Sequence, residues 1–323
     1  MVYDTIRLRN TGIGENGMIE TRLLNYFLTI IREQNITRAA EALHLTQPTL
    51  SKQIKELDEH LGKQLLIRGK KKVTLTDEGA FLRARAQEML ELMEKTESAF
   101  RAEHAITGGD IYLGCGETAA MDMITEVYRK LHDQYPDIHF HTHSGDAETV
   151  MERLDKGLID MGLLLGPIRQ DKYEYLNIRQ KDTFVLLMRR DCMLAKKEQI
   201  TIADMKGLPL LFPEQTYSGN QQLEWSGMDY RSLNIVATYN LIYNATFLVE
   251  KGIGYALTLA NLVNTEGPRS LTFRPVTPEI AVDLYIVTKK YQTFSPAAKL
   301  YLDFLKNLNI IFDYLFISSY KPV

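Results

Sequence analysis

The sequence has only two cysteines, Cys115 and Cys192, among its 323 residues. Their spacing fits neither a metal site nor the dense disulfide framework of a small secreted protein. No apolar run approaches the roughly 18 residues that a membrane-spanning helix needs. Residues 1–17 contain no apolar core of the kind that a signal peptide has. We therefore expect a cytoplasmic protein without a membrane partner, in which residues 1–17 form a disordered extension.

The sequence also lacks a recognisable pairing of a nucleophile with a general base, so we expect no enzymatic activity. One segment, Gly114–Ala119, fits the G-x-G-x-x-A pattern of a dinucleotide-binding turn between a strand and a helix. Such a turn needs an acidic residue at the end of the next strand, and Asp146 stands too far along. We therefore expect no cofactor. Within this segment Cys115 is expected to be a buried small apolar residue, because only a helix start is available to activate its thiol.

Three histidines alternate along the segment Ile138–His143, so their imidazoles share one face of a strand. His139, His141 and His143 have no carboxylate or cysteine nearby that completes a recognisable set of metal ligands. A solvated or interface surface is therefore the favoured interpretation, with a metal site as the alternative. We predict no metal.

Positive charge is concentrated near the N-terminus of a chain whose formal net charge is −3. Residues 36–75 contain eight Lys and Arg residues against four Asp and Glu residues, a local net charge of +4. A basic module on a mildly acidic chain is typical of a DNA-binding domain attached to a second domain. The length of the chain also indicates two or three domains.

The basic module begins with two short amphipathic helices joined by a tight turn. Asn35 is placed to cap the first helix, His44-Leu45 forms the turn, and Thr46 caps the second helix. Pro48 lies in the first turn of the second helix, where its missing N–H costs nothing. This pattern predicts a helix-turn-helix whose second helix enters the major groove of DNA. An ordinary helical hairpin is the alternative, but the following segment Leu65–Leu75 predicts two strands around a basic tip, which is a wing.

This region contains two ordered stretches, RAAEALHLTQPTLSKQIKELDEHLGKQLLIR and VTLTDEG. Together they resemble the N-terminal domain of LysR-type transcriptional regulators, and the match runs without a gap from about Leu23 to about Phe100. Asp58 stands where the family usually has Glu, and Lys52 stands where it usually has Arg. Lysine supplies a point charge without the planar fork that arginine offers to guanine.

The resemblance and the exposed start of the second helix together predict a DNA-binding surface. Side chains at that start should reach base edges, while cations of the wing should contact the phosphate backbone or the minor groove. The predicted DNA-binding residues are Gln47, Pro48, Thr49, Ser51, Lys52, Lys55, Arg68, Lys70, Lys71 and Lys72.

A long helix is predicted after the wing, with Thr76 as its N-cap. Its seam residues are spaced alternately by four and three, which is typical of a coiled coil. A single helix lying on its own core is the alternative, but charged flanks make a dimerising linker the favoured interpretation. The predicted dimerisation residues are Leu82, Ala86, Met89, Met93 and Phe100. Thr107-Gly108-Gly109 is expected to end the helix.

From Asp110 onward, predicted strands alternate with helices, which indicates parallel sheets with right-handed crossovers. The stretches PDIHFHTHSGDAETVMERLDKGLIDMGLLL and LVEKGIGYALTLANLV resemble the effector-binding half of LysR-type regulators. The resemblance implies an α/β fold: an N-terminal winged helix-turn-helix with a long linker helix, then a two-lobed effector domain of the periplasmic-binding-protein (type II) kind. The expected boundaries are 18–76 for the DNA-binding domain, 77–106 for the linker helix, 107–306 for the effector domain and 307–323 for an apolar C-terminal extension. This extension is expected to dock on the protein or on its partner subunit.

The effector is expected between the two lobes, where strands end and helices begin. Helix starts at Thr118 and near Asp146 favour a small polar or anionic molecule, although Glu117 and Asp146 oppose a second negative charge. In the resemblance, Thr118 holds the position of an effector-contacting Ser or Thr. The predicted effector-binding residues are Glu117, Thr118, Ser144, Asp146, Gly166, Pro167, Thr216, Tyr217 and Asn240.

These patterns predict a sequence-specific DNA-binding transcriptional regulator whose DNA binding or activation is modulated by a small effector. The expected partners are double-stranded DNA, the effector, further copies of the chain in a homodimer or homotetramer, and RNA polymerase. The alternative is a DNA-binding and oligomerisation protein whose α/β half binds no small molecule.

Overall fold

The computed structural model describes residues 18–69, 72–101, 108–166, 171–214, 233–266 and 270–319. The chain divides into two compact units, residues 1–97 and 98–323. None of the helices formed by the described residues has the length and apolar character that crossing a membrane requires.

The first unit is a small helical core followed by a two-stranded wing. It contains the helices α1 (Thr21–Glu33), α2 (Ile36–Ala42) and α3 (Gln47–Leu61) and the antiparallel strands β1 (Leu66–Arg68) and β2 (Val73–Leu75). Apolar residues recur at helical spacing, so the three helices bury one face each, and Phe27 and Leu57 are fully buried where these faces meet. As predicted, the Asn35 and Thr46 side chains cap α2 and α3. The helix-turn-helix and its wing are confirmed.

The long helix α4 (Asp77–Arg101) follows the wing, and Thr76 Oγ1 caps it by accepting a hydrogen bond from the Gly79 N–H at 2.9 Å. Near its start, Leu82 and Ala86 are 7% and 0% exposed because they pack into the core of their own unit. Within the single chain these two residues therefore contact their own core, and their part in a dimer seam stays a prediction.

The later seam positions of α4 are open to solvent within the single chain. The side chains of Met89, Met93 and Phe100 are 47%, 41% and 85% exposed. Their role in dimerisation stays a prediction. A spacing of four and three places a residue on one face of a helix, but it does not say whether the surface opposite belongs to the same chain or to another.

Gly108 and Gly109 begin a strand, so their role is not to end the linker helix, as the sequence analysis expected. The strand is β3 (Gly108–Cys115), and Gly108 pairs with Asp137 of its neighbour. A Cβ atom on Gly108 would lie 2.8 Å from the Asp137 carbonyl oxygen, so glycine permits a close approach of two strands here. In the local sequence, a glycine that permits this close approach cannot be distinguished from a glycine that ends a helix.

The second unit consists of two α/β lobes, of which the first holds β3 centrally between two parallel neighbours. Its elements are β3, α5 (Met121–Gln134), β4 (Asp137–Ser144), α6 (Ala147–Asp155), β5 (Met161–Leu165) and the C-terminal helix α10 (Pro296–Ser319). Side chains alternate across the sheet, so Leu163 faces a core shared with α5 and α10, and Leu164 faces α6.

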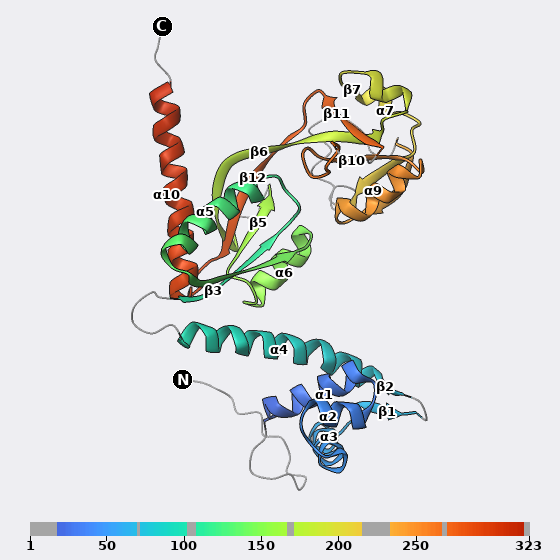
Figure 1. Cartoon of the computed structure of the whole chain (residues 1–323), viewed down its shortest axis with the longest axis vertical. Coiled ribbons are helices and arrows are strands. Elements are labelled where there is room, and N and C mark those ends of the chain that lie inside the picture. The colour runs from blue at the N-terminus through green and yellow to red at the C-terminus, as the bar shows by residue number, and fades with distance from the viewer. Residues whose placement is uncertain are drawn as a thin grey trace. The chain divides into compact units, whose positions relative to one another are not determined.

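Two long strands join the lobes. β6 (Tyr173–Arg189) pairs with β12 (Ala281–Lys289) in the first lobe and with β10 (Tyr255–Leu259) in the second (Figure 1). Both pairings are antiparallel, as is the pairing of β12 with β5. The predicted parallel sheets are therefore only part of the architecture, because β6 and β12 pass directly between lobes without a helical crossover.

The second lobe repeats the arrangement of helices on both faces of a sheet. Its elements are η1 (Met193–Lys196), β7 (Ile200–Thr201), α7 (Ile202–Met205), β8 (Leu210–Pro213), β9 (Ile235–Tyr239), α9 (Ile242–Glu250), β10 and β11 (Leu271–Thr277). α9 packs on one face against Leu211 and Ala256, while α7 packs on the other against Leu210 and Leu257. The sheet order across both lobes is β4-β3-β5-β12-β6-β10-β8-β9.

The helix α10 extends beyond residue 306, where the sequence analysis placed the end of the effector domain, and it continues to Ser319. Its first part is anchored by Tyr301, which is fully buried and donates a hydrogen bond to the Ile124 carbonyl at 2.8 Å. The docking of residues 307–323 stays a prediction.

Candidate functional site

The exposed start of α3 carries the side chains that the sequence analysis assigned to base recognition. Gln47, Pro48, Thr49, Lys52 and Lys55 are exposed, and Ser51 is half-buried. The Gln47 amide donates a hydrogen bond to Ser51 Oγ at 2.9 Å, which orients the amide along the exposed face. Gln47 therefore retains its amide oxygen and a second N–H to offer to a base edge.

The two lysines of α3 are held only by exposed ion pairs. Lys52 Nζ lies 3.8 Å from Glu56, and Lys55 Nζ lies 3.2 Å from Glu59, each one helical turn away. Such exposed pairs contribute little and are screened by salt, so both lysines can exchange these partners for phosphates.

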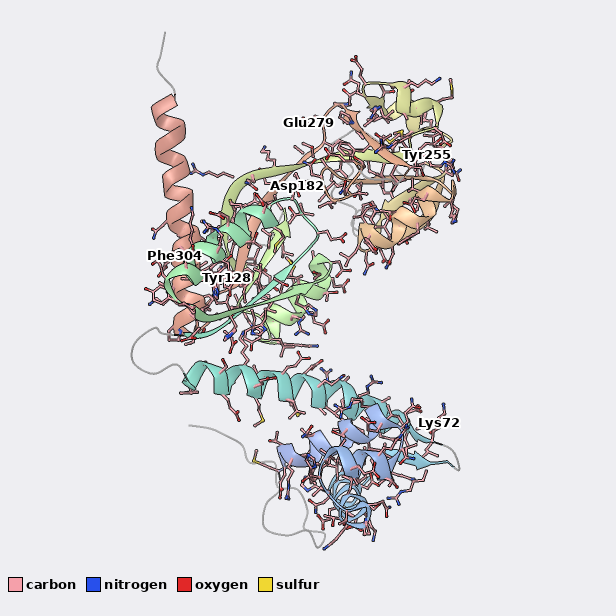
Figure 2. The ribbon with its side chains drawn as sticks, viewed as in Figure 1. Lys72, Tyr128, Asp182, Tyr255, Glu279 and Phe304 are labelled. Carbon is pink, nitrogen blue, oxygen red and sulfur yellow. The ribbon has the colours of Figure 1, made fainter. Side chains whose placement is uncertain are left out.

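The wing adds two exposed cations among the described residues, Arg68 at the end of β1 and Lys72 before β2. Figure 2 labels Lys72. Lys70 and Lys71 lie outside the described residues. Asp58 accepts a hydrogen bond from the Leu65 N–H at 3.0 Å. Burial raises the pKa of this carboxyl group. Asp58 thus ties the end of α3 to the start of the wing and has a structural role.

A cleft opens in the second unit where the two lobes face each other. Its walls are the strand ends and helix starts of both lobes and the two strands that join them. The lining residues are Gly116, Glu117, Gly145, Asp146, Ala147, Leu163, Leu164, Leu165, Phe184, Pro213, Tyr239, Asn240, Leu241, Ile242, Thr258, Leu259, Leu262 and Val282.

Three of the predicted effector-binding residues, Glu117, Asp146 and Asn240, line this cleft. Thr118 and Ser144 line a second pocket that shares Gly116, Glu117 and Leu262 with it. Gly166 is not among the lining residues of either pocket, and a Cβ there would lie 2.4 Å from the Tyr285 ring. Of the remaining predicted residues, Pro167, Thr216 and Tyr217 lie outside the described part of the chain.

The Thr118 hydroxyl is already engaged within the protein. It donates a hydrogen bond to Asp182 Oδ2 at 2.5 Å and accepts one from the Ala120 N–H at 3.1 Å. Asp182 lies on β6 and is 7% exposed (Figure 2). Burial raises the pKa of this carboxyl group, although the hydrogen bonds from Thr118 and the Ala119 N–H act in the opposite direction. Thr118 therefore joins the first loop of the lobe to the connecting strand.

Glu117, which directly precedes Thr118 in the sequence, makes a contact from the first lobe to the second. Its Oε2 accepts a hydrogen bond from the Ile242 N–H, the first residue of α9, at 2.6 Å. On the first lobe, Asp146 Oδ1 caps α6 by accepting from the Thr149 N–H at 2.8 Å. Both acids belong to the cleft, and its lining as described contains no Lys, Arg or His.

The sequence analysis missed the apolar part of the lining. Leu165, Tyr239 and Leu259 each end a strand and could have been found by extending the same strand-end argument to β5, β9 and β10. Tyr239 donates to the Leu257 carbonyl at 2.5 Å, and burial raises its pKa. Phe184 and Val282 lie on the connecting strands, and no local sequence signal places them at the cleft.

The histidine strand β4 forms the edge of the sheet in the first lobe. His141 Nε2 lies 2.8 Å from Asp110 Oδ1, its ring stacks on Tyr112 at 4.7 Å between centroids, and His139 lies 3.9 Å from the same oxygen. Burial opposes ionisation of Asp110, but hydrogen bonds from Ser98 and His141 outweigh it and hold the pKa of Asp110 below its usual value. Among the residues described, no group of three His, Cys, Asp or Glu side chains is arranged to hold a metal ion.

Cys115 is buried at the end of β3, as the sequence analysis expected, and burial raises the pKa of its thiol. A thiol with a raised pKa carries little thiolate at neutral pH and is a poor nucleophile.

Comparison with protein families gives one match for each unit. Residues 21–80 match the family described as bacterial regulatory helix-turn-helix protein, lysR family. Residues 105–309 match the LysR substrate binding domain.

Two curated relatives extend over nearly the whole chain. The hca operon transcriptional activator HcaR of Escherichia coli is 29% identical over 287 residues, covering 87% of this chain and 95% of HcaR. The uncharacterized HTH-type transcriptional regulator YvbU of Bacillus subtilis is 26% identical over 287 residues, covering 88% of this chain and 97% of YvbU.

Solved structures show the same fold. The crystal structure of CbnR, a LysR family transcriptional regulator, matches with a TM-score of 0.72 at 20% identity, covering 90% of this chain and 99% of CbnR. Full-length CbnR complexed with its target DNA matches with a TM-score of 0.71 at 19% identity, with the same two coverages.

Proposed function

Because this chain belongs to the LysR family of bacterial transcriptional regulators, we propose that it binds a specific DNA site as an oligomer and responds to a small molecule held in the cleft between its α/β lobes. The family consists of transcriptional regulators and not of enzymes. The proposed place of action is the cytoplasm, where bacterial DNA lies, and RNA polymerase is the proposed further partner.

One observation carries the proposal. A single chain combines a helix-turn-helix whose recognition helix is exposed at its start with a two-lobed unit that has a cleft between its lobes. A ligand that prefers one arrangement of the lobes can bias the DNA-binding state only through its different affinity for the two arrangements.

The test uses the full-length protein in two steps. Selection from a library of random duplexes identifies the DNA site, and a metabolite library is then screened for compounds that raise the melting temperature, since a ligand of the native state stabilises it. The proposal expects at least one such compound to change the affinity for the selected site. Failure of every compound to change DNA binding would favour the alternative, in which the α/β half serves only for assembly.

Gln47→Ala is expected to reduce discrimination between the selected site and unrelated DNA by about 1–3 kcal/mol, since a base contact is lost. Lys72→Ala is expected instead to weaken binding to all sequences and to reduce the slope of log affinity against log salt by about 1, because it removes one phosphate contact. Fluorescence anisotropy over a range of salt concentrations measures both effects. Equal losses on specific and unrelated DNA from both variants would contradict the division into base-reading and phosphate-binding residues.

The exposed apolar side chains of α4 are the proposed dimer contact. In a two-stranded coil, residue 93 of one subunit lies against residue 93 of the partner or against a close neighbour of it. Met93→Glu therefore places a charge from each subunit in an apolar contact, and the dimer is expected to dissociate at micromolar concentration. Analytical ultracentrifugation of the full-length protein measures the change.

Gln87→Glu is the matched control for this prediction. Gln87 is exposed on the same helix, and a turn of about 100° per residue places it nearly opposite Met89. The Gln87→Glu substitution adds the same single charge as Met93→Glu and is expected to leave the dimer intact. A Met93→Glu protein that sediments like the wild type would show that α4 does not hold the subunits together.

A further inference from the structure

The start of α9 is capped by a carboxylate from the other lobe. The first N–H groups of a helix lack partners within the helix and lie at the positive end of its dipole. Leu241, the N-cap residue of α9, makes no side-chain capping bond, and Ile242 instead donates its N–H to Glu117 Oε2 at 2.6 Å. The two residues are 125 positions apart in the sequence, so this contact is a product of the lobes facing each other.

Glu117 therefore occupies the place in the cleft that would otherwise suit an anionic group. The opposite helix start is occupied in the same way, because Asp146 caps α6 through the Thr149 N–H. The described lining supplies no Lys, Arg or His to neutralise a further negative charge, and most of the remaining lining is apolar. Among the described lining residues, a carboxylate entering this cleft would lose water and meet two fixed carboxylates without a cation.

We propose that Glu117 is a built-in anion that sets the charge selectivity of the cleft: it excludes carboxylate effectors and admits apolar molecules that carry an amine or no charge. An ammonium group would pair with Glu117 and Asp146, while the apolar body would contact residues such as Phe184 and Leu259. The inference rests on the proposed function in one respect, that the effector binds in this cleft. It reverses the anionic effector that the helix starts alone suggested in the sequence analysis.

The test is a gain of carboxylate binding. Benzoate, benzylamine and benzyl alcohol are matched in size and differ in charge, and isothermal titration calorimetry of the full-length protein measures each. Glu117→Ala frees the Ile242 N–H and removes a negative charge, so benzoate affinity is expected to rise at least tenfold while benzylamine affinity falls. Glu117→Gln, which keeps an acceptor for the N–H without the charge, is expected to bind benzoate with an intermediate affinity.

Two control variants locate the effect. Glu148→Gln removes an exposed carboxylate of the first turn of α6 that does not line the cleft, and it is expected to change no affinity. In Glu117→Ala/Ile242→Pro the charge is removed but the freed N–H is absent, so benzoate affinity should fall back to the intermediate level of Glu117→Gln. Proline suits this position because it is the first of the helix, and Leu241 before it has φ −126° and ψ 137°, which a residue preceding proline readily adopts.

Failure of Glu117→Ala to gain benzoate affinity overturns the proposal, as does a gain that Glu148→Gln reproduces. A gain confined to the Glu117 variants, with Glu117→Gln and Glu117→Ala/Ile242→Pro at the same intermediate level, supports it. Because these measurements need neither DNA nor the natural effector, they separate this inference from the proposed function. That function fails independently, when no compound alters DNA binding by the wild type.

Discussion

Replacing Thr118 by Val is expected to lower the free energy of unfolding of the second unit by about 1.5–3 kcal/mol at pH 7, the usual worth of a hydrogen bond to a charged group. The substitution keeps the shape of the side chain but leaves Asp182, which is 7% exposed, without the hydroxyl that donates to it at 2.5 Å. Because that hydrogen bond favours the charged carboxylate, its loss also raises the pKa of Asp182 further. Chemical denaturation of the full-length protein, followed by circular dichroism, measures the change.

The pH dependence of this pair follows from the raised pKa of Asp182. A carboxyl group whose pKa is higher in the folded state than in the unfolded chain favours folding when it is protonated, and this contribution is lost as pH rises through the folded-state pKa. Asp182→Asn removes the titration and keeps an acceptor oxygen, so its stability relative to the wild type should increase from acidic to neutral pH. A constant difference would contradict the assignment.

The two substitutions form a double-mutant cycle. In the Asp182→Asn background, Thr118→Val should cost only about 0.5–1.5 kcal/mol, because the lost hydrogen bond is then between neutral groups. Equal costs in both backgrounds would show that the Thr118 hydroxyl acts independently of the Asp182 charge.

Phe27→Ala is expected to lower the free energy of unfolding of the first unit by about 3–5 kcal/mol, which is most of the stability of a small domain. Phe27 is 0% exposed in the core formed by α1, α2, α3, the start of the wing and the start of α4. DNA binding should be lost at 37 °C, while the second unit keeps its structure because its cores share no residue with this one. Hydrogen exchange measured by mass spectrometry should show loss of protection in residues 21–61 and unchanged protection in residues 137–165.

Phe81→Ala is the matched control, since Phe81 is 67% exposed on α4. A change of less than about 0.5 kcal/mol is expected there, as for most surface positions. Loss of protection in the second unit of Phe27→Ala would show that the two units unfold together.

Local signals made the first unit predictable. The caps at Asn35 and Thr46 and the left-handed turn at His44, with φ 54°, each depend on residues within a few positions of one another. The heptad spacing of α4 was equally visible, but it did not separate Leu82, which contacts its own core, from Met93, which is exposed. Heptad spacing identifies which residues share one face of a helix. Which surface packs against that face depends on the tertiary structure.

The cleft was predictable in position and less so in chemistry. The rule that ligands bind where strands end led to Glu117, Asp146 and Asn240 without knowledge of the structure. The hydrogen-bond partners of the cleft residues could not be predicted from the sequence. Glu117 accepts from Ile242, which is 125 positions away in the sequence, and Thr118 donates to Asp182, which is 64 positions away. Helix starts therefore suggested a vacant anion site, whereas the protein places its own carboxylate there.

The route of the chain through β6 and β12 also determines the order in which the second unit is completed during synthesis. The first lobe begins with β3, but its core includes Leu284 and Ile286 of β12 and Tyr301 of α10. The entire second lobe is translated between these parts. A nascent chain that has just emerged as far as β11 therefore exposes the unfinished apolar face of its first lobe, and translation must pass Tyr301 before that face is covered.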